Sequence, residues 1–587
     1  MADTDKKQNV LNGAMVLVVA TALVKVIGAI YKIPLTDIIG TLGRGYFSSA
    51  YNIYTTVYGI SMAGLPVAVS ALVSRNAALG KYRDVKQVLL TTFPLFLGIG
   101  IVGTAALMIL AKPYAASVNA PLAVYSIIAI APSILFCCVM STYRGYYEGL
   151  NNMFPTAISQ VIESAGKLLF GLTLSYAALK YTTAQYDLKG SVFGVKDPAM
   201  IPAISAAAAI TGVTIGTVIG AVYTNMRHRL KKDGITRAML INSPRPVSQK
   251  TTVRDLLKIA LPAAVSSLVL NITNFIDSWM IQNRLSSVVA NHYGELMGIY
   301  GEYVKAAGVA RENIHTFLYG AYDTTLDLKN LIPTIVMTLG VSAIPVVSSA
   351  MAKKDKKLVD STVNTVFRVS ALVAFPAGAG FLALAEPILT LLYNGGENQY
   401  GIPIAAPVLA LYGVMMIILT LSSPLTNIMQ AIGRADVPAK ALALGCVFKI
   451  GINYILIGIP SINIKGAVFG TALFYLICIV YNYIVLKKET GLKLDIGSIF
   501  IKPVICAALC GGAAALTNTV LCKILDFGDM TGRLNGHSLA CLISICVAGV
   551  VYLAAVLLSK TIKKDDILML PKGEKIAEIL AKYKLLG

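Results

Sequence analysis

Charged residues are scarce in this chain: Asp, Glu, Lys and Arg make up 13% of its 587 residues, whereas apolar residues make up 56%. Soluble globular domains are about 25% charged and about 45–50% apolar. A soluble fold of this length needs a charged surface, and the sequence lacks the residues to form one. The composition, with a mean hydropathy of +0.71, therefore excludes a cytosolic enzyme, a disordered scaffold and a disulfide-linked secreted module. We expect an all-α polytopic membrane protein.

Motifs for covalent chemistry are missing as well. The sequence contains no GxxxxGK[ST] loop for a nucleotide and no HExxH zinc motif. The nine cysteines lie in or beside apolar segments without CxxC spacing, which is typical of small residues that face lipid or the protein core. We therefore expect no enzyme activity, no catalytic residues, no cofactor and no metal site.

Apolar segments of about 20 residues, the length that crosses a bilayer, recur along the whole chain. We predict fourteen transmembrane helices, near residues 11–36, 46–73, 87–111, 122–142, 155–180, 200–225, 255–282, 331–351, 362–388, 402–429, 438–459, 464–486, 500–522 and 538–559. An even number of spans places both termini on the same side of the membrane.

The excess of positive charge selects that side. The chain has 50 Lys and Arg against 29 Asp and Glu, a net charge of +21. In a soluble protein this excess suggests nucleic acid, but cytoplasmic loops of membrane proteins are also rich in Lys and Arg. With the N-terminus in the cytoplasm, the inside loops, among them 74–86, 226–254 and 352–361, carry most of the cations. We therefore expect two cytoplasmic termini and no nucleic-acid partner.

Two short similarities relate the first six spans to the next six. Residues 64–71 (GLPVAVSA) match residues 343–350 (AIPVVSSA). Residues 149–167 parallel residues 431–449, and both of these segments end in a lysine. Both matches occur at equivalent spans, as expected for a transporter with two related halves. The sequence thus predicts two pseudo-symmetric six-helix lobes plus two extra C-terminal helices, an arrangement that suits alternating access.

The predicted domains follow from this repeat. Residues 1–250 form an N-lobe of spans 1–6 with a basic cytoplasmic linker, and residues 251–490 form a C-lobe of spans 7–12. Residues 491–587 contain spans 13–14 and a cytoplasmic amphipathic tail.

Four lysines inside predicted spans are the candidate substrate-binding residues. An ionisable group there costs about 2.5–3.5 kcal/mol on insertion scales and usually faces a water-filled cavity. Lys25 and Lys32 lie two turns apart on one face of the first span, and Lys167 and Lys449 occupy matching positions of spans 5 and 11. Because lysine holds phosphate as a compact point charge, we predict an anionic substrate with a phosphate or pyrophosphate group.

Other polar residues in the spans leave two interpretations open. Glu163 is four residues before Lys167, so it forms either a neutralising intrahelical pair or part of a substrate or ion site. Asp277 binds a coupling cation or forms an interlobe pair with a lysine of span 1. Coupling to Na+, to H+ or to the membrane potential stays open. Arg368, near the inner end of span 9, is expected to snorkel to the membrane surface.

A stripe of tyrosines in the second span has two readings. Tyr51, Tyr54 and Tyr58 follow one another at helical spacing along one face. The stripe either contacts a sugar or packs against a neighbouring helix.

Four segments carry a family resemblance. Lys25-Val-Ile-Gly-Ala-Ile-Tyr-Lys32-Ile-Pro, Ala63-Gly-Leu-Pro-Val-Ala-Val-Ser, the stretch from Arg144 to Gln160 (RGYYEGLNNMFPTAISQ) and Ala385-Glu-Pro-Ile-Leu-Thr-Leu-Leu-Tyr resemble the stage V sporulation protein B and lipid II flippase (MurJ) branch of the MOP exporter superfamily. The resemblance extends over nearly the whole chain. Family members usually place arginine at the positions matching Lys25 and Lys32, where this chain has lysine.

The resemblance implies a flippase for peptidoglycan biosynthesis and cell shape. Such a protein moves an undecaprenyl-pyrophosphate-linked precursor, lipid II, from the inner to the outer leaflet of the bacterial plasma membrane. The implied partners are this lipid-linked sugar pyrophosphate, membrane lipids and cell-wall synthesis proteins. The alternatives are a flippase for another lipid-linked unit in polysaccharide export, a MATE-type multidrug antiporter, and a scaffold that transports nothing.

Overall fold

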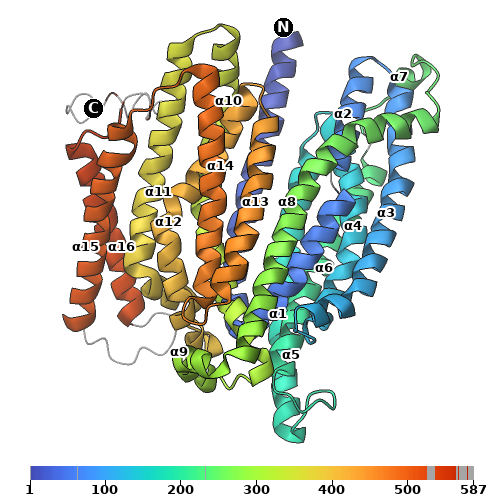
Figure 1. Ribbon diagram of the computed structural model, residues 1–587. Helices are drawn as coiled ribbons and strands as arrows, with labels where there is room; N and C mark the ends of the chain where they lie inside the picture. The colour runs from blue at the N-terminus through green and yellow to red at the C-terminus, as the bar shows by residue number, and fades with distance from the viewer. Residues whose placement is uncertain are drawn as a thin grey trace. The chain divides into compact units, whose positions relative to one another are not determined.

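The computed structural model describes residues 2–62, 64–231, 233–524 and 536–563, together with Asp566 and Glu578. The described chain is helical and contains no strand; one isolated bridge joins Val192 and Val195. Figure 1 shows the helices in chain order. They are α1 (Ala2–Met62), α2 (Leu65–Ala78), α3 (Tyr82–Ser117), α4 (Ala123–Gly149), α5 (Phe154–Lys189), α6 (Met200–Leu230), α7 (Arg237–Ile241), α8 (Gln249–Asn291), α9 (Tyr293–Ala306), α10 (Ile314–Ala352), α11 (Lys356–Tyr393), α12 (Ile402–Ala431), α13 (Asp436–Ile457), α14 (Gly466–Thr490), α15 (Lys502–Ile524) and α16 (Gly536–Leu558).

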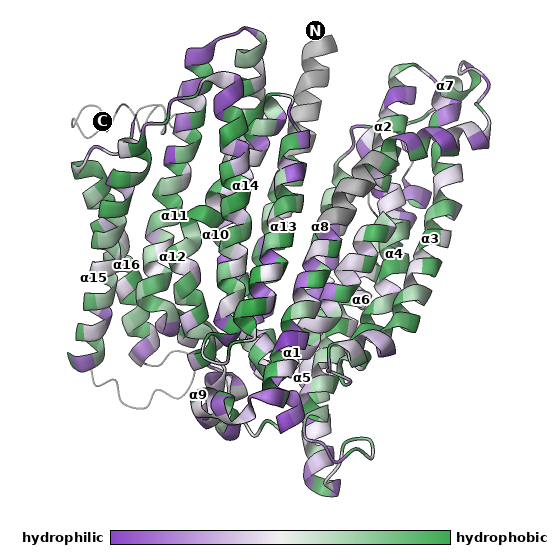
Figure 2. Ribbon diagram, viewed as in Figure 1, coloured by the Kyte–Doolittle hydropathy of each residue, from purple (hydrophilic) through white to green (hydrophobic). Residues whose placement is uncertain are grey.

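The long helices have the length and composition of membrane spans. Within the described residues, ten segments are long and apolar enough to cross a bilayer. Apolar residues run along these helices, and hydrophilic residues gather at helix ends and in the connecting loops (Figure 2). The prediction of an all-helical, multi-pass membrane protein is therefore confirmed. The number fourteen and the arrangement in two lobes stay predictions.

Left-handed glycines interrupt the helices at two places, one in the gap between the first two predicted spans and one inside the second. Within α1, Gly40 has a φ of 70° and a ψ of 172°, so two helical segments meet there. Gly64, with a φ of 71°, precedes α2, which starts with a proline in its first turn. Glycine adopts this left-handed region without the strain of a Cβ atom. The predicted span 46–73 is consequently divided between the end of α1 and the start of α2.

The chain divides into two compact units. Unit 1 contains residues 1–286 and 309–320, and unit 2 contains residues 287–308 and 321–587. Most of α8 thus belongs to unit 1, together with the first turns of α10. The lobes at 1–250 and 251–490, which rest on a sequence repeat, stay a prediction. The predicted amphipathic tail lies outside the described residues, apart from residues 561–563, Asp566 and Glu578.

In unit 1, small residues bring helices into close contact. A Cβ atom at Gly212 of α6 would lie 2.2 Å from the backbone nitrogen of Gly171 in α5, and one at Gly216 would lie 2.5 Å from the Glu163 carbonyl. Gly171 also leaves room for the ring of Tyr31, because a Cβ atom added at Gly171 would lie only 2.7 Å from that ring. Glycines permit such backbone approach between membrane helices. They place α1, α5 and α6 around Tyr31.

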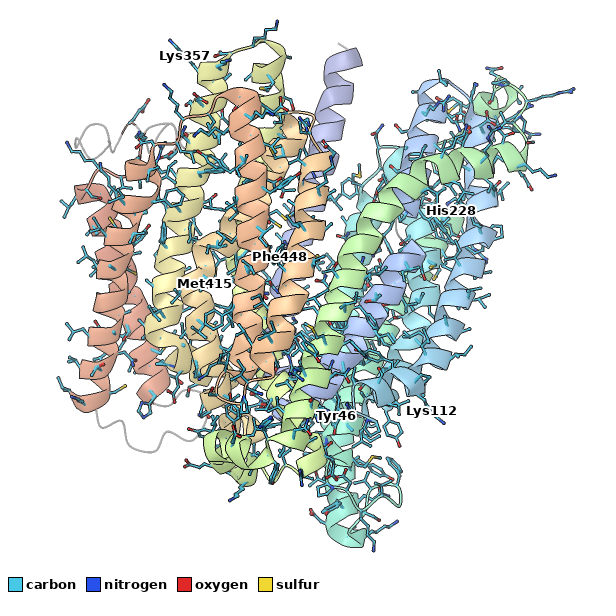
Figure 3. The ribbon with its side chains drawn as sticks, viewed as in Figure 1. Tyr46, Lys112, His228, Lys357, Met415 and Phe448 are labelled. Carbon is cyan, nitrogen blue, oxygen red and sulfur yellow. The ribbon has the colours of Figure 1, made fainter. Side chains whose placement is uncertain are left out.

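The start of α10 packs onto α1 in the same manner. An added Cβ at Gly45 would lie 2.3 Å from the Thr316 carbonyl oxygen, and one at Gly320 would lie 2.0 Å from that of Thr41. The Tyr46 hydroxyl, labelled in Figure 3, donates a hydrogen bond to Asn313 Oδ1 at 2.9 Å. These contacts attach residues 309–320 to unit 1.

Candidate functional site

Lys167 lies between two tyrosine rings of α1. Its Nζ atom is 4.8 Å from the ring centroid of Tyr31 and 5.6 Å from that of Tyr51. Tyr31 is buried, and Lys167 is half-buried. A lysine ammonium within about 6 Å of an aromatic face is attracted by the ring quadrupole. This arrangement partly shields the Lys167 ammonium from water and connects α5 to α1.

Tyr51 also belongs to the tyrosine stripe predicted in the second span. The ring centroids of Tyr51 and Tyr54 are 5.7 Å apart, as are those of Tyr54 and Tyr58. Tyr54 is buried, whereas Tyr51 and Tyr58 are half-buried. Packing therefore accounts for the middle ring, and Tyr51 is the member that reaches Lys167.

Glu163 has a cationic partner in α4. Arg144 Nη2 donates a hydrogen bond to Glu163 Oε2 at 3.0 Å, and its Nε donates one to Ser159 Oγ at 2.8 Å. The two side chains are 16% and 29% exposed. Arg144 was not among the predicted site residues, although it opens the segment 144–160 that carries the resemblance. The intrahelical pairing of Glu163 with Lys167 stays a prediction.

Lys25 and Lys32 lie on the segment of α1 that precedes Gly40. Lys25 is exposed and Lys32 is half-buried. The backbone carbonyl of Lys32 accepts a hydrogen bond from Thr36 Oγ1 at 2.8 Å. Both lysines belong to unit 1, as do Lys167 and Glu163, so the structure assigns three of the four predicted lysines to one compact unit. Their binding roles stay predictions.

Arg44 is a buried cation that the sequence analysis missed. Its residue is 2% exposed, and its Nη1 atom donates a hydrogen bond to Thr36 Oγ1 at 2.8 Å. The residue lies between two predicted spans, where a cation is expected to reach water. The turn at Gly40 instead continues into helix, so Arg44 remains inside unit 1. Its position in a predicted loop gave no sign that this cation is buried.

Asp277 is half-buried in the part of α8 that belongs to unit 1. Its neighbour Ser278 takes part in a polar network with α1 and α10. Asn52 Nδ2 donates hydrogen bonds to Ser278 Oγ at 2.9 Å and to the Tyr319 hydroxyl at 2.8 Å. One turn away, Ser49 Oγ donates to Gln282 Oε1 at 2.6 Å. This network holds the α8 segment that carries Asp277 against α1; cation binding and interlobe pairing by Asp277 both stay predictions.

Lys449 lies in unit 2, on α13. Its Nζ atom is 5.9 Å from the ring centroid of Phe474 in α14. Lys167 and Lys449, which the internal repeat aligns, therefore both lie beside aromatic rings. A binding role for Lys449 stays a prediction.

Arg368 does not snorkel as the sequence suggested. Its residue is 3% exposed, and its Nε and Nη2 atoms donate hydrogen bonds of 2.7 and 2.5 Å to the two carboxylate oxygens of Asp566. A bidentate carboxylate partner makes burial of the guanidinium tolerable. That partner comes from the segment after α16, 198 residues away, so the apolar context of Arg368 could not reveal it.

A second group of charges lies where the linker after α6 meets α3 and α4. The carboxylate of Asp233 accepts hydrogen bonds from Lys86 and from the Tyr146 hydroxyl. Burial raises the pKa of Asp233, but these two hydrogen bonds outweigh burial and hold its pKa below the ordinary range. Nearby, His228, labelled in Figure 3, forms a hydrogen bond of 3.0 Å with the Tyr147 hydroxyl. These contacts fix the start of the linker to the helix ends.

Metal chemistry finds no support in the part of the chain that the structure describes. No cluster of three or more His, Cys, Asp or Glu side chains there could hold a metal ion. The long apolar helices define a multi-pass membrane protein.

The chain belongs to the polysaccharide biosynthesis protein family, whose profile matches residues 10–352. The lipid II flippase MurJ profile matches residues 331–531. Among known proteins, lipid II flippase MurJ of Bacillus subtilis (strain 168) is 25% identical over 92% of this chain and 94% of its own length. Stage V sporulation protein B of the same strain is 21% identical over 96% and 98%.

Solved structures show the same fold. Lipid II flippase MurJ in an inward closed conformation has a TM-score of 0.62 at 15% identity, covering 93% of this chain and 98% of that one. An inward-facing multidrug resistance MATE family transporter of the MOP superfamily has a TM-score of 0.56 at 14% identity, covering 80% and 98%. The predicted resemblance to the MurJ and stage V sporulation protein B branch is confirmed.

Proposed function

We propose that the chain is a flippase that moves an undecaprenyl-pyrophosphate-linked cell-wall precursor, lipid II, between leaflets by alternating access. The observation that carries the proposal is Lys167, held against Tyr31 and Tyr51 beside the Arg144–Glu163 pair, in a chain that matches a lipid II flippase over 92% of its length. The protein acts by binding and reorientation, without covalent chemistry.

The chemistry of this cluster suits a pyrophosphate. Lysine binds phosphate as a point charge, and the two tyrosine rings keep the Lys167 ammonium partly desolvated, where its attraction for an anion is stronger than in water. Lys25 and Lys32 on α1 add positive charge to the same unit, and Lys449 supplies the matching cation of unit 2. Glu163 balances Arg144 while the site is empty and competes with an incoming anion for it.

The protein functions in a bacterial plasma membrane with both termini in the cytoplasm. The basic loops support this orientation through the positive-inside rule. The substrate then enters from the cytoplasmic leaflet, where lipid-linked precursors are assembled, and cell-wall synthesis proteins receive it outside. Glu163 and Asp277 are the candidate groups for coupling to Na+, H+ or the membrane potential.

The test is outer-leaflet exposure of lipid II in cells depleted of their own lipid II flippase. The wild-type chain restores exposure and growth, and Lys167→Ala reduces exposure about tenfold or more, the effect of one lost charge-assisted contact. Lys180→Ala is the matched control, because Lys180 lies on the same helix with its Nζ atom 4.8 Å from the ring centroid of Tyr176. If cells with Lys167→Ala expose as much lipid II on the outer leaflet as cells with the wild-type chain, the proposed role of Lys167 in substrate binding is refuted.

A flippase for another lipid-linked polysaccharide unit is the second candidate. The longer of the two family matches, over residues 10–352, is to the polysaccharide biosynthesis family. If the expressed wild-type chain leaves lipid II inside, this candidate is favoured, and the same variants are then assayed with other undecaprenyl-pyrophosphate sugars. Efflux of cationic drugs by the wild-type chain would instead favour a MATE-type antiporter.

A further inference from the structure

A groove lies between α5 and α6 in unit 1, away from the Lys167 cluster. It has a volume of about 660 Å³ and is lined by Phe154, Ile158, Ile162, Ile219, Val222, Tyr223, Met226, Arg227, Leu230 and Lys231. Because an α-helix has 3.6 residues per turn, Phe154, Ile158 and Ile162 share one face of α5. Lys167 lies on the opposite face, so this groove and the candidate substrate site are separate.

The register of the helix pair gives the groove one polar end. Gly166 lies against Gly216, and Gly171 lies against Gly212, which shows that α5 and α6 run antiparallel. The first turn of α5 therefore lies beside the last turn of α6. The two cations of the groove, Arg227 and Lys231, are at this end, and the rest of its lining is apolar apart from the Tyr223 hydroxyl.

Arg227 is incompletely satisfied by the protein. Its guanidinium carbon is 5.7 Å from the ring centroid of Tyr147, and its Nη1 atom is buried without a hydrogen-bond partner among the described residues. A buried donor without a partner destabilises the state that contains it. No acidic residue lines the groove, so a counter-charge for its cations must come from outside the groove lining.

The apolar part of the groove has the surface that an acyl chain needs. Val222 is 48% exposed, Met226 is 54% exposed and Ile158 is 42% exposed. Together they continue from the cationic end along the helix pair. A ligand that fits must have an anionic head and an apolar tail, and anionic lipids of a bilayer have this form.

We propose that this groove binds an anionic phospholipid of the bilayer. Its phosphate contacts Arg227 and Lys231, and an acyl chain lies over Ile158, Val222 and Met226. The net positive charge of the lining selects an anionic headgroup over a zwitterionic one, because basic side chains at a membrane surface attract anionic lipids. The site is independent of the transported substrate, since it lies on the other face of α5.

The test is native mass spectrometry of the full-length protein with phosphatidylglycerol or phosphatidylcholine. The wild-type protein retains phosphatidylglycerol in preference to phosphatidylcholine. Replacing both cations (Arg227→Gln with Lys231→Gln) lowers phosphatidylglycerol affinity about tenfold or more, as expected for lost charge-assisted hydrogen bonds. Arg229→Gln is the matched control, because Arg229 is an exposed cation of the same turn that does not line the groove.

Two further measurements separate lipid binding from folding. Phosphatidylglycerol raises the Tm of the wild-type protein, since a ligand of the folded state stabilises it, and this rise disappears in the double variant. Val222→Trp fills the apolar part of the groove and reduces binding with both cations intact. Equal retention of the two lipids by the wild-type protein, unchanged phosphatidylglycerol affinity in the double variant, or unchanged lipid binding in Val222→Trp would overturn the proposal.

Discussion

One arginine–carboxylate pair of unit 1 and one of unit 2 differ in burial. Arg144 and Glu163 in unit 1 are 16% and 29% exposed, with one hydrogen bond between them at 3.0 Å. Arg368 and Asp566 in unit 2 are both 3% exposed and joined by two hydrogen bonds. A partly exposed pair can exchange its partner for water or a substrate anion, whereas separating a fully buried pair leaves uncompensated charge. The first pair therefore suits a binding site, and the second fastens the C-terminal segment.

Removing one partner of the buried pair is expected to have the largest effect. Asp566→Ala leaves the Arg368 guanidinium buried without a counter-charge, which destabilises a protein by about 3–5 kcal/mol. We expect a large fall in Tm and in the yield of folded protein, measured by thermal unfolding in detergent. A variant with Arg368→Met and Asp566→Leu should recover much of the loss. Wild-type stability of Asp566→Ala would show that this pair does not hold the tail.

The contact of Asp233 with Lys86 and Tyr146 is expected to contribute an intermediate amount to stability, and this contribution depends on pH. The folded protein holds the pKa of Asp233 below its ordinary value, so its stabilisation is complete above the unfolded pKa of about 3.9 and is lost as pH falls through the lower folded value. Asp233→Ala at neutral pH should destabilise by about 1.5–3 kcal/mol, because hydrogen bonds to a charged group are lost.

The measurement for this contact is Tm as a function of pH. The difference between the wild-type protein and Asp233→Asn should narrow toward acidic pH, as protonation removes the charge from the wild-type carboxyl. A constant difference across that range would contradict an ionised Asp233 in the folded protein.

The partly exposed pair of unit 1 should matter more for transport than for stability. Glu163→Gln is expected to lower the free energy of unfolding by about 1 kcal/mol, since glutamine keeps a hydrogen-bond acceptor for Arg144 and only the charge is lost. Because the charge that competes for Arg144 is removed, we expect outer-leaflet exposure of lipid II to change. A loss of stability as large as that of Asp566→Ala, with unchanged transport per folded molecule, would remove the distinction between the two pairs.

The surface pair Lys563–Asp495 is expected to contribute least to the free energy of unfolding. Lys563 Nζ lies 3.0 Å from Asp495 Oδ2, and the two side chains are 42% and 47% exposed. Asp495→Asn should change the free energy of unfolding by less than about 1 kcal/mol, measured beside Asp566→Ala in the same detergent. Because Lys563 and Asp566 belong to the same segment, a large effect at Asp495 would show that the surface contact, not the buried pair, fastens the tail.

Much of the fold could be predicted from the sequence because membrane insertion imposes a strong, local requirement. A run of apolar residues long enough to cross a bilayer must be helical. The helices α3, α6 and α12 contain a predicted span in full, and α4 and α16 match theirs to within about one residue. The interruption at Gly40 falls in the gap between the predicted spans 11–36 and 46–73. The one at Gly64 lies inside the second of these spans, because hydropathy averages over a window and conceals a single left-handed glycine.

The sequence by itself determined that this protein is a multi-pass membrane protein and, through local motifs such as the one beginning at Arg144, which family it belongs to. Only the tertiary structure decided which charges meet. Glu163 has a cationic partner in α4, and Arg368 contacts a carboxylate 198 residues away. The physical reason is that insertion free energy depends on a segment and its neighbours in sequence, whereas the partner of a buried charge depends on which helix faces pack together.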